Sequence, residues 1–373
     1  MKILSITSLF PNCKEPNKGI FILNKLNEMK KYANIEVIAP IPWFPFVTQN
    51  RPRGIPATEY INGIKVYHPR FFSIPKFFKF LDGYFFYLSL KKFRKKIKKA
   101  NIIDAHFGWP DGYGAWLIAK KNKKKISITL QGKDANFWAR KPFVKNKISK
   151  MLENSAFVTA VSENLKNKLR NKKIKVITNC VDSKKFKPLN KNKSRKKLKI
   201  ALNKKVFLTV GEDFKRKGFF ELAQSFDRMD IQNKLLIIVG YDIKEFKNLQ
   251  RKISLLGCKD QIKLVGQLRN EKLPIYYSSA DIYCLVSYSE GWPNSVMEAL
   301  ACGKPCIVTQ EAAGEFITPE LGIITNHQNL TDDLEKALHK KWNLKQILDF
   351  ARRNSWDKSA KKTYLYFKKI LAQ

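Results

Sequence analysis

Two glutamates and the short segment between them are the residues of this sequence best suited to chemistry on a charged substrate. Glu290 and Glu298 enclose a segment that includes Gly291, Trp292, Pro293, Asn294 and Ser295. Gly291 and Pro293 predict a tight turn after an apolar strand, and a helix is predicted to begin near Asn294. A helix N-terminus carries free N–H groups and partial positive charge, which suit an anionic phosphate.

The two carboxylates would then have different surroundings. Glu290 would lie in the loop and Glu298 about one turn inside the helix, so one could meet sugar hydroxyls and the other a ribose diol. The alternative is an ordinary surface glutamate beside a glutamate in the first turns of a helix. The spacing of the two carboxylates alone does not decide between these interpretations.

These residues belong to the second of two runs of alternating strands and helices. Short apolar segments alternate with amphipathic basic segments, the pattern of βα units. In the first run, strands are predicted at residues 2–6, 35–39, 65–67, 102–106, 127–130, 157–161 and 175–178, with a helix at 19–31. In the second run, strands are predicted at 206–210, 234–239, 262–265, 282–286 and 305–309, with helices at 218–228, 243–256 and 295–301.

A Lys/Asn-rich segment separates the two runs. Residues 187–199 have no apolar periodicity and carry a dense block of like charge, so they predict a linker. Two doubly wound α/β domains are therefore expected, over residues 1–186 and 187–355. Ligands of such sheets bind beyond the carboxyl ends of the strands.

The segment from Glu290 to Pro305 resembles the E-x7-E signature of the family 4 glycosyltransferases, commonly written E-G-F/W-P-N-x-x-x-E-A-x-A-C/S-G-K-P. The resemblance implies that Glu290 contacts the donor sugar and Glu298 the nucleotide ribose. It also implies the GT-B fold, two facing Rossmann-like domains with an interdomain cleft, whose last helix, here residues 356–373, crosses back to the N-terminal domain. Retention of configuration at the donor's anomeric carbon and no obligatory metal are further implications.

The loop after residues 206–210 resembles the V-G-R-x-x-x-x-K-G loop of the same family, which supplies an Arg and a Lys to the donor diphosphate. Gly211 and Lys217 match, but Glu212 stands at the Arg position. A carboxylate there would repel a diphosphate. Lys215 or Arg216 is a candidate for the missing charge, with a solvated surface role as the alternative for each.

Three further segments follow the family's order. Val265–Leu268, with Gly266 and Gln267, resembles the strand and loop whose backbone groups hold the nucleobase. Residues 176–188 resemble the crossing into the second domain. In the N-terminal half, Gly19 precedes the first helix, where a glycine lets the backbone approach a phosphate or sugar closely. An ordinary loop glycine is the alternative.

The acceptor side is predicted from residues 104–112 and 129–134. These segments resemble the H-A-H-F-x-x-P-D-G and T-L-H/R-G-S-D stretches of a subgroup that includes teichuronic-acid and capsule-type polysaccharide transferases. At the position where many members place an active-site His, this sequence has Gln131, followed by Gly132. Asp134 and His106 remain candidates for proton transfer, and a structural role is the alternative for His106.

The amino-acid composition limits which binding partners and which cellular compartment are expected. The 373 residues include 72 Lys plus Arg against 31 Asp plus Glu, a formal net charge of +41. Such a field attracts polyanions, although Lys used as generic surface is the alternative. No apolar run reaches about 18 residues, so no transmembrane helix is expected. Phe10–Asn12 interrupts the apolar N-terminus without a cleavage site, which favours a first strand over a signal peptide and a cytoplasmic protein.

The segment Phe71–Arg94 interleaves aromatic residues with lysines. Such a mixture suits the membrane interface, and an anionic membrane surface, on the inner face of the cytoplasmic membrane, is a candidate partner. The alternative is a core-packing helix pair with a basic outer face. Without a recognised nucleic-acid module, specific nucleic-acid binding is not expected.

Together these patterns predict a retaining glycosyltransferase that moves a sugar from a UDP- or GDP-linked donor to a glycan acceptor, expected to be lipid-linked, in cell-surface polysaccharide biosynthesis. The nucleotide-sugar is a substrate, and no cofactor or metal site is expected. The alternatives are an epimerase or phosphorylase on the same fold, a non-catalytic nucleotide-sugar-binding protein, which Glu212 and Gln131 favour, and a basic nucleic-acid-binding protein.

Overall fold

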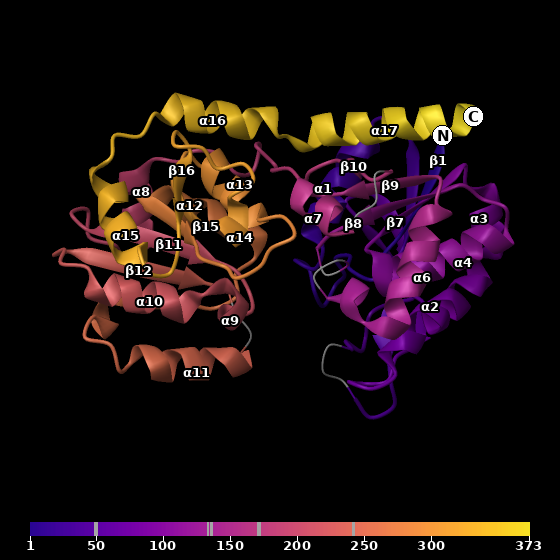
Figure 1. The fold of residues 1–373 in the computed structure, drawn as a ribbon, viewed down its shortest axis with the longest axis horizontal. Coiled ribbons are helices and arrows are strands. Elements are labelled where there is room, and N and C mark those ends of the chain that lie inside the picture. Colours follow the sequence, from indigo (N-terminus) through magenta and orange to yellow (C-terminus); the bar gives the residue numbers. More distant parts are fainter. Residues whose placement is uncertain (48–50, 133, 135–136, 170–172, 241–242) are drawn as a thin grey trace. The chain divides into compact units, whose positions relative to one another are not determined.

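The computed structural model describes residues 1–47, 51–132, 134, 137–169, 173–240 and 243–373 (Figure 1). It divides the chain into two compact units, the first made of residues 1–179 and 356–373 and the second of residues 180–355. The boundary predicted between residues 186 and 187 therefore lies too far along the chain. Val181 and Phe186 are buried in the core of the second unit, which draws this segment away from the first.

The first unit contains a sheet of eight strands in the order β10-β9-β8-β7-β1-β2-β5-β4, parallel except where β4 pairs with β5. The strands are β1 (Lys2–Ile6), β2 (Asn34–Ile38), β4 (Thr58–Ile61), β5 (Ile64–Tyr67), β7 (Ile102–His106), β8 (Ile126–Leu130), β9 (Phe157–Ala160) and β10 (Lys175–Val176). The predicted strands of this half are confirmed. The sequence missed β4 and a small sheet of β3 (Ile41–Trp43) and β6 (Arg70–Phe72).

Helices pack on this sheet from both ends of the chain. The first-unit helices are α1 (Ile20–Met29), α2 (Asp82–Leu90), α3 (Arg94–Lys99), α4 (Tyr113–Lys121), α6 (Pro142–Glu153), α7 (Glu163–Leu169) and α17 (Trp356–Ala372). The C-terminal helix α17 packs beside α1, and Phe367 joins Ile3 and Leu26 in one core (Figure 1). The sequence-distant ends of the chain thus complete one unit.

The second unit contains six parallel strands in the order β13-β12-β11-β14-β15-β16, which is the Rossmann order. The strands are β11 (Lys205–Val210), β12 (Lys234–Val239), β13 (Ile262–Val265), β14 (Ile282–Leu285), β15 (Cys306–Thr309) and β16 (Gly322–Thr325). The five predicted strands are confirmed, and β16 was missed. The strand order reverses between β11 and β14, the point at which sheets of this order bind their ligands beyond the carboxyl ends of the strands.

Two layers of helices carry the apolar side chains that cover this second sheet. The helices are α8 (Lys191–Lys197), α9 (Phe214–Lys217), α10 (Phe219–Arg228), α11 (Ile243–Ile253), α12 (Leu273–Ser279), α13 (Asn294–Ala301), α14 (Gln310–Ala313), α15 (Leu330–His339) and α16 (Leu344–Arg353). Residues of α10, α11 and α15 share one core cluster, and residues of α12, α13 and α16 share another. None of the helices in the described residues is both long and apolar enough to cross a membrane.

The predicted linker, residues 187–199, is wrong in its central part because it contains helix α8. Asn190 caps this helix by accepting a hydrogen bond from the backbone N–H of Lys193. Arg195 is buried, donates to the carbonyl of Ser279 at 2.9 Å and pairs with Asp281 at 2.8 Å. The block of like charge is therefore anchored to the second unit by one buried arginine.

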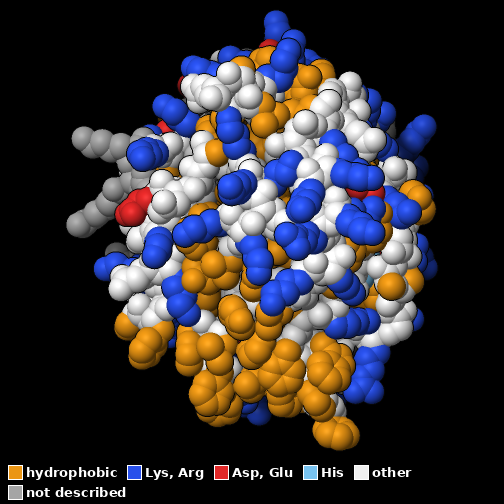
Figure 2. All heavy atoms as spheres, turned by 90° about the vertical axis from the view of Figure 1, so that its right-hand side faces the viewer, with side chains coloured by type: hydrophobic (Ala, Val, Ile, Leu, Met, Phe, Trp, Pro, Cys, Tyr) orange, Lys and Arg blue, Asp and Glu red, His pale blue; other side chains and the backbone are white. Residues whose placement is uncertain are grey.

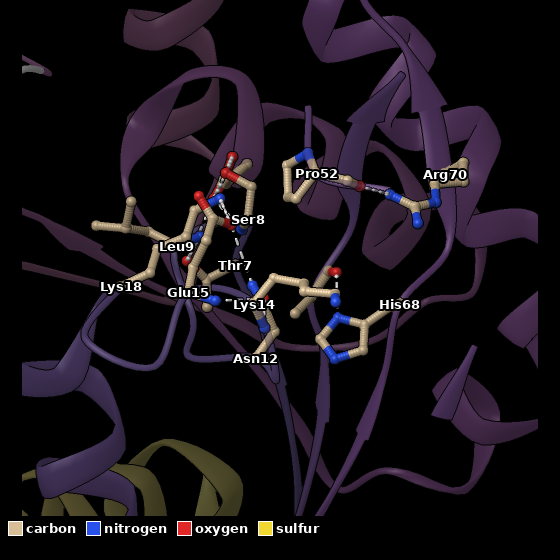
Figure 3. Close-up of polar contacts among 12 residues, drawn as sticks. Thr7, Ser8, Leu9, Asn12, Lys14, Glu15, Lys18, Pro52, His68 and Arg70 are labelled. Carbon is tan, nitrogen blue, oxygen red and sulfur yellow. Dashed lines mark hydrogen bonds and ion pairs between the residues drawn. The ribbon is translucent and has the colours of Figure 1, made fainter. Parts of the chain in front are cut away.

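The loop between β1 and α1 is held by its own polar contacts (Figure 3). Ser8 donates from its backbone N–H and its hydroxyl to Asp111, and the N–H of Leu9 donates to Thr7 Oγ1 at 3.1 Å. Gly19 adopts φ +63°, and a Cβ added there would lie 2.0 Å from the carbonyl oxygen of Leu9. The backbone of Leu9 thus requires a glycine at this position, and the approach of Gly19 to a phosphate or sugar stays a prediction.

Replacing Gly19 by Ala should therefore destabilise the first unit by at least about 2 kcal/mol, because a left-handed conformation and a backbone clash are combined. Urea unfolding measures this change. Gly54→Ala is the matched control: Gly54 has φ +74°, but an added Cβ meets nothing closer than a lysine side-chain carbon at 3.5 Å. Equal losses in the two variants would contradict a role for the Leu9 contact.

Candidate active site

The loops after β11 and β14 lie against each other at the point where the strand order reverses. Gly218, at the end of the first loop, adopts φ +66°, and an added Cβ would lie 2.5 Å from the carbonyl oxygen of Val286. The N–H of Tyr288 donates to the carbonyl of Arg216 at 2.9 Å. Gly211 leaves room for the stem of Lys217, whose Cε would be 2.9 Å from an added Cβ. Small residues therefore allow the two loops to meet.

Glu290 is the centre of the polar cluster formed by these loops. Its Oε1 accepts hydrogen bonds from Lys217 Nζ at 2.7 Å, Arg216 Nη1 at 2.9 Å and the Ser287 hydroxyl at 2.9 Å. The side chains of Glu290 and Lys217 are each only 10% exposed. Burial by itself would raise the pKa of Glu290, but the charges of Lys217 and Arg216 outweigh it and lower the pKa below its ordinary value. Glu290 is therefore a carboxylate at neutral pH.

Two cations contact the Glu290 carboxylate. Lys217 and Arg216 share one carboxylate, while Arg216 also contacts the exposed Asp213 at 3.2 Å. Of the two residues predicted to replace the missing arginine, Arg216 reaches the cluster, whereas Lys215 is exposed. Glu212 is exposed as well and accepts a hydrogen bond from Gln267 Nε2 at 3.1 Å. The departure from the family pattern at Glu212 thus leaves a two-cation cluster in place.

Glu298 lies in α13 with its carboxyl group removed from solvent. Its Oε2 accepts a hydrogen bond from the hydroxyl of Tyr277, a buried residue of α12, at 2.8 Å. Burial raises the pKa of Glu298 to about 7, against the opposing effects of the Tyr277 hydrogen bond and the Lys185 charge. The group is therefore close to its titration midpoint at neutral pH, ready to be converted to the charged form by a hydrogen-bond donor.

The beginning of α13 presents unsatisfied polar groups. The helix starts at Asn294, after Pro293, without a side-chain cap. Asn294 Oδ1 and Trp292 Nε1 are buried and have no hydrogen-bond partner among the residues that the structure describes. Buried polar groups are nearly always hydrogen-bonded in native proteins. These two atoms indicate a place for a polar ligand at the start of α13, near Gly291 and Ser295.

The loop predicted to hold a nucleobase follows β13. Gly266 and Gln267 are exposed, and the N–H of Gly240 donates to the carbonyl of Val265 at 3.1 Å. Through the Gln267–Glu212 hydrogen bond, this loop joins the loop after β11. The second unit therefore brings together the cations, both glutamates' loops and the predicted base loop at one edge of one sheet.

The remaining predicted residues belong to the first unit. His106 is fully buried, with Nε2 at 3.3 Å from an oxygen of Asp104 on the same strand. Asp134 is also fully buried and accepts hydrogen bonds from the backbone N–H groups of Gln131 and Gly108. Burial raises its pKa, partly opposed by these hydrogen bonds. Neither His106 nor Asp134 offers an exposed atom to a substrate, and their predicted part in proton transfer stays a prediction.

Gln131 and Gly132 form a tight turn beside these buried groups. The side-chain oxygen of Gln131 accepts a hydrogen bond from Asn179 Nδ2 at 3.1 Å. Gly132 adopts φ +124°, which other residues rarely adopt. The side chain of Gln131, at the position of the expected histidine, is thus oriented by an asparagine that precedes the boundary between the units.

Sequence reasoning missed several members of the site: Tyr277, Ser287, Asn179 and Asp213. Ser287 lies three residues before Glu290 in the same loop, so a local hydrogen bond could have been predicted. Tyr277 lies in α12, 21 residues before Glu298, and no local sequence pattern predicts the hydrogen bond between them.

Comparison with known proteins gives matches to family models, to sequence relatives and to solved structures. Residues 34–185 match the family model described as Glycosyltransferase Family 4, and residues 190–363 match that of Glycosyl transferases group 1. The chain is 29% identical over 324 residues to a putative teichuronic acid biosynthesis glycosyltransferase, TuaC, of Bacillus subtilis, covering 83% of this chain and 81% of that protein. It is 31% identical to UDP-Gal:alpha-D-GlcNAc-diphosphoundecaprenol alpha-1,3-galactosyltransferase of Escherichia coli, over 37% of this chain and 36% of that protein.

Solved structures share the fold along the whole chain. Sucrose-phosphate synthase of Thermosynechococcus elongatus has a TM-score of 0.83 at 18% identity, with all of both chains covered. HepE of Anabaena, solved in complex with UDP, has a TM-score of 0.77 at 16% identity, covering 99% of this chain and 100% of that one. Fold and relatives define a sugar-transferring enzyme of the GT-B class, and the chain belongs to glycosyltransferase family 4.

The pKa values of Glu298 and Glu290 are shifted in opposite directions, so the two residues make the stability of the second unit depend on pH with opposite sign. The pKa of Glu298 is raised from 4.5 to about 7, so its contribution to stability is full below pH 4.5 and is lost as the pH rises toward 7. Glu298→Gln should remove this loss, a gain of at most on the order of 3 kcal/mol at pH 8 relative to pH 4.5. Urea unfolding of both proteins at the two pH values measures it.

Glu290→Gln is the control of opposite sign. The pKa of Glu290 is lowered, so its contribution is present above pH 4.5 and is lost as the pH falls below that value. Glu290→Gln should therefore lose stability relative to the wild type at pH 8. A Glu298→Gln protein with the same pH profile as the wild type would contradict the raised pKa.

Proposed function

We propose that this glycosyltransferase takes its sugar from a nucleotide-sugar donor bound at the carboxyl edge of the second unit's sheet. The observation that carries the proposal is the buried Glu290 carboxylate held by Lys217 and Arg216 at the reversal of the strand order. Such a crevice is where doubly wound sheets bind nucleotides. Structures of HepE contain UDP and UDP-glucose, and the Escherichia coli relative is named for a UDP-galactose donor, which supports a uridine nucleotide as the first choice over GDP.

In this proposal the cations neutralise the departing nucleoside diphosphate. When the bond between the anomeric carbon and the phosphate oxygen breaks, negative charge grows on the diphosphate. Lys217, Arg216 and the uncapped start of α13 supply positive potential there, and groups aimed at developing charge lower the barrier most. These side chains take the part a metal would otherwise play, and we propose no metal for the step.

The two glutamates then have separate tasks. Glu290 accepts hydrogen bonds from donor-sugar hydroxyls while it keeps Lys217 and Arg216 in position. Glu298 accepts hydrogen bonds from the ribose diol, which favours its charged form. Trp292 Nε1 and Asn294 Oδ1, two buried atoms without a hydrogen-bond partner in the described residues, lie between Glu290 and Glu298 in sequence. We assign both side chains to contacts with the donor.

The acceptor side completes the proposal. We propose transfer with retention of configuration to a glycan acceptor carried on a lipid diphosphate, in cell-surface polysaccharide biosynthesis. The names of the Bacillus subtilis and Escherichia coli relatives support this choice. We assign Gln131 to acceptor binding, and Asp134 and His106 to the packing of the neighbouring loop, because both are fully buried. The acceptor hydroxyl forms the new bond to the anomeric carbon, and its proton is taken by the departing diphosphate.

The donor site is tested first by calorimetric titration of UDP and of GDP. One nucleotide should bind, and Glu298→Ala should weaken its binding by about 10- to 100-fold, because hydrogen bonds to a charged group are each worth about 1.5–3 kcal/mol. Binding near pH 7 should also release protons, seen as a heat that depends on the buffer. Glu320→Ala, at an exposed site of the same unit, is the control. If neither nucleotide binds, or if binding ignores Glu298, the non-catalytic alternative is favoured.

Glu290→Gln should separate catalysis from nucleotide binding. Loss of the carboxylate removes the sugar contact but leaves both cations, so turnover of the donor should fall by about 100-fold or more while the nucleotide binds at least as tightly. Lys217→Ala should weaken both turnover and binding. Lys215→Ala, three residues after Glu212 in the same loop but exposed, serves as the control and should resemble the wild type. Steady-state donor consumption and nucleotide affinity are the two readouts.

A further inference from the structure

Six exposed aromatic side chains of the first unit are defined here as the aromatic surface. They are Phe46, Phe77, Phe78, Tyr84, Phe137 and Phe143, whose exposed fractions range from 48% to 97%. They come from four segments that are separate in sequence: the residues after β3, the residues before α2, α2 itself, and the residues around the start of α6. Figure 2 shows hydrophobic side chains collected at one end of this face of the molecule. Exposed apolar patches of this kind mark interaction sites.

The structure separates this surface from the core. In the segment 71–94, Phe71 and Phe86 are buried and contact each other edge-on at 5.3 Å between ring centroids. Phe77 and Phe78 are 67% and 56% exposed in the same segment. The core-packing interpretation of the aromatic-basic stretch thus applies to Phe71 and Phe86, whereas Phe77 and Phe78 lie at the surface. The sequence pattern did not include Phe46, Phe137 or Phe143, which only the fold adds.

Ring contacts connect Phe78, Phe137 and Phe143 to neighbouring aromatic side chains. Phe78 contacts Phe80, and Phe80 contacts Phe143 at 5.6 Å between centroids. Phe137 packs edge-on against Trp138, which in turn contacts the buried Trp109. Residues so anchored lose little side-chain entropy on binding, because their neighbours already restrict them.

Basic residues surround the aromatic surface, and acidic ones are almost missing from its segments. Lys76, Arg140, Lys141 and Lys145 are exposed, and the Lys141 amino group lies 5.0 Å from the ring centre of Phe137. The only acidic residue among residues 71–99 is Asp82, which is buried and bonded to Ser73 and Lys79. In the view of Figure 2, lysine and arginine side chains border the hydrophobic end. The surface therefore combines apolar rings with an uncompensated positive field.

We propose that the aromatic surface docks the first unit on an anionic lipid bilayer. The phenylalanine rings enter the interface at headgroup depth, and the surrounding lysines and Arg140 meet the lipid phosphates. Five of the six residues are phenylalanines, whose side chains have no hydrogen-bonding atom. Such side chains suit the apolar interior of a bilayer better than the surface of a polar partner. The proposal goes beyond sugar transfer, and it depends on the proposed function only in that a lipid-linked acceptor would give the docking its use.

The energetics favour two signals acting together. Burial of the large apolar side chains and attraction of the basic residues to an anionic surface contribute separately to membrane binding. Stable anchoring to a membrane takes more than one weak signal. Removing either the rings or the anionic lipid should therefore release the protein.

Co-sedimentation of the full-length protein with lipid vesicles tests the proposal. The protein should bind vesicles that contain phosphatidylglycerol far better than vesicles of phosphatidylcholine alone. The variant Phe46→Ser/Phe77→Ser/Phe143→Ser should partition at least about tenfold less to the anionic vesicles. Its fold should be retained, since the three side chains are 97%, 67% and 74% exposed, and thermal unfolding checks this. Leu255→Ser, at an 83% exposed position of the second unit, is the matched control and should bind like the wild type.

Three outcomes would overturn the proposal. The wild type could fail to bind anionic vesicles, or the triple variant could bind them like the wild type, which would leave only non-specific charge attraction. The triple variant could also lose binding to a single-stranded RNA homopolymer as strongly as it loses vesicles, which would assign the surface to nucleic acid. Calorimetric nucleotide binding by the triple variant should stay unchanged, so a failed donor site and a failed membrane surface give different results.

Discussion

The buried charge of Glu290 is the constraint on which the site depends. An ionised carboxylate removed from water costs several kcal/mol unless cations and hydrogen bonds replace the lost solvation. Here Lys217, Arg216 and Ser287 do so, and two of the three come from another loop than the one that carries Glu290. The loops after β11 and β14 must therefore stay together, which explains why Gly218 lies under the carbonyl of Val286, where a side chain would clash.

The two units place their polar groups by the same topology but with different electrostatics. In the first unit the strand order reverses between β1 and β7, and Asp111, after β7, accepts hydrogen bonds from Thr7 and Ser8, after β1. Burial raises the pKa of Asp111 to about 7, partly opposed by these neutral donors. In the second unit the corresponding carboxylate has cations as partners and stays charged. The two reversals thus hold carboxyl groups in different ways, one with neutral hydroxyl and N–H donors and the other with cations.

The departures from the family pattern are compensated by neighbours rather than left isolated. Glu212 accepts a hydrogen bond from Gln267, and Arg216 supplies charge at Glu290. Gln131 is oriented by Asn179. Gln267 and Asn179 lie far in sequence from the residues they contact, whereas Arg216 follows Glu212 by four residues in the same segment. These contacts make the loop after β11 and the loop after β13 one connected edge, on which the proposed nucleotide would rest.

The sequence by itself determined the alternation of strands and helices, the two α/β units and the family, because apolar periodicity and the Glu290–Pro305 signature are local. It also named Glu290, Lys217 and Arg216. It did not reveal β16, helix α8, the Tyr277 partner of Glu298 or the aromatic surface, and it placed the domain boundary too late. Burial and partnership decide these features, and both depend on residues distant in the chain. The charged segment that contains α8 is held on the second unit by the contact between Arg195 and Asp281. Whether a given phenylalanine is buried or exposed depends on the tertiary packing around it.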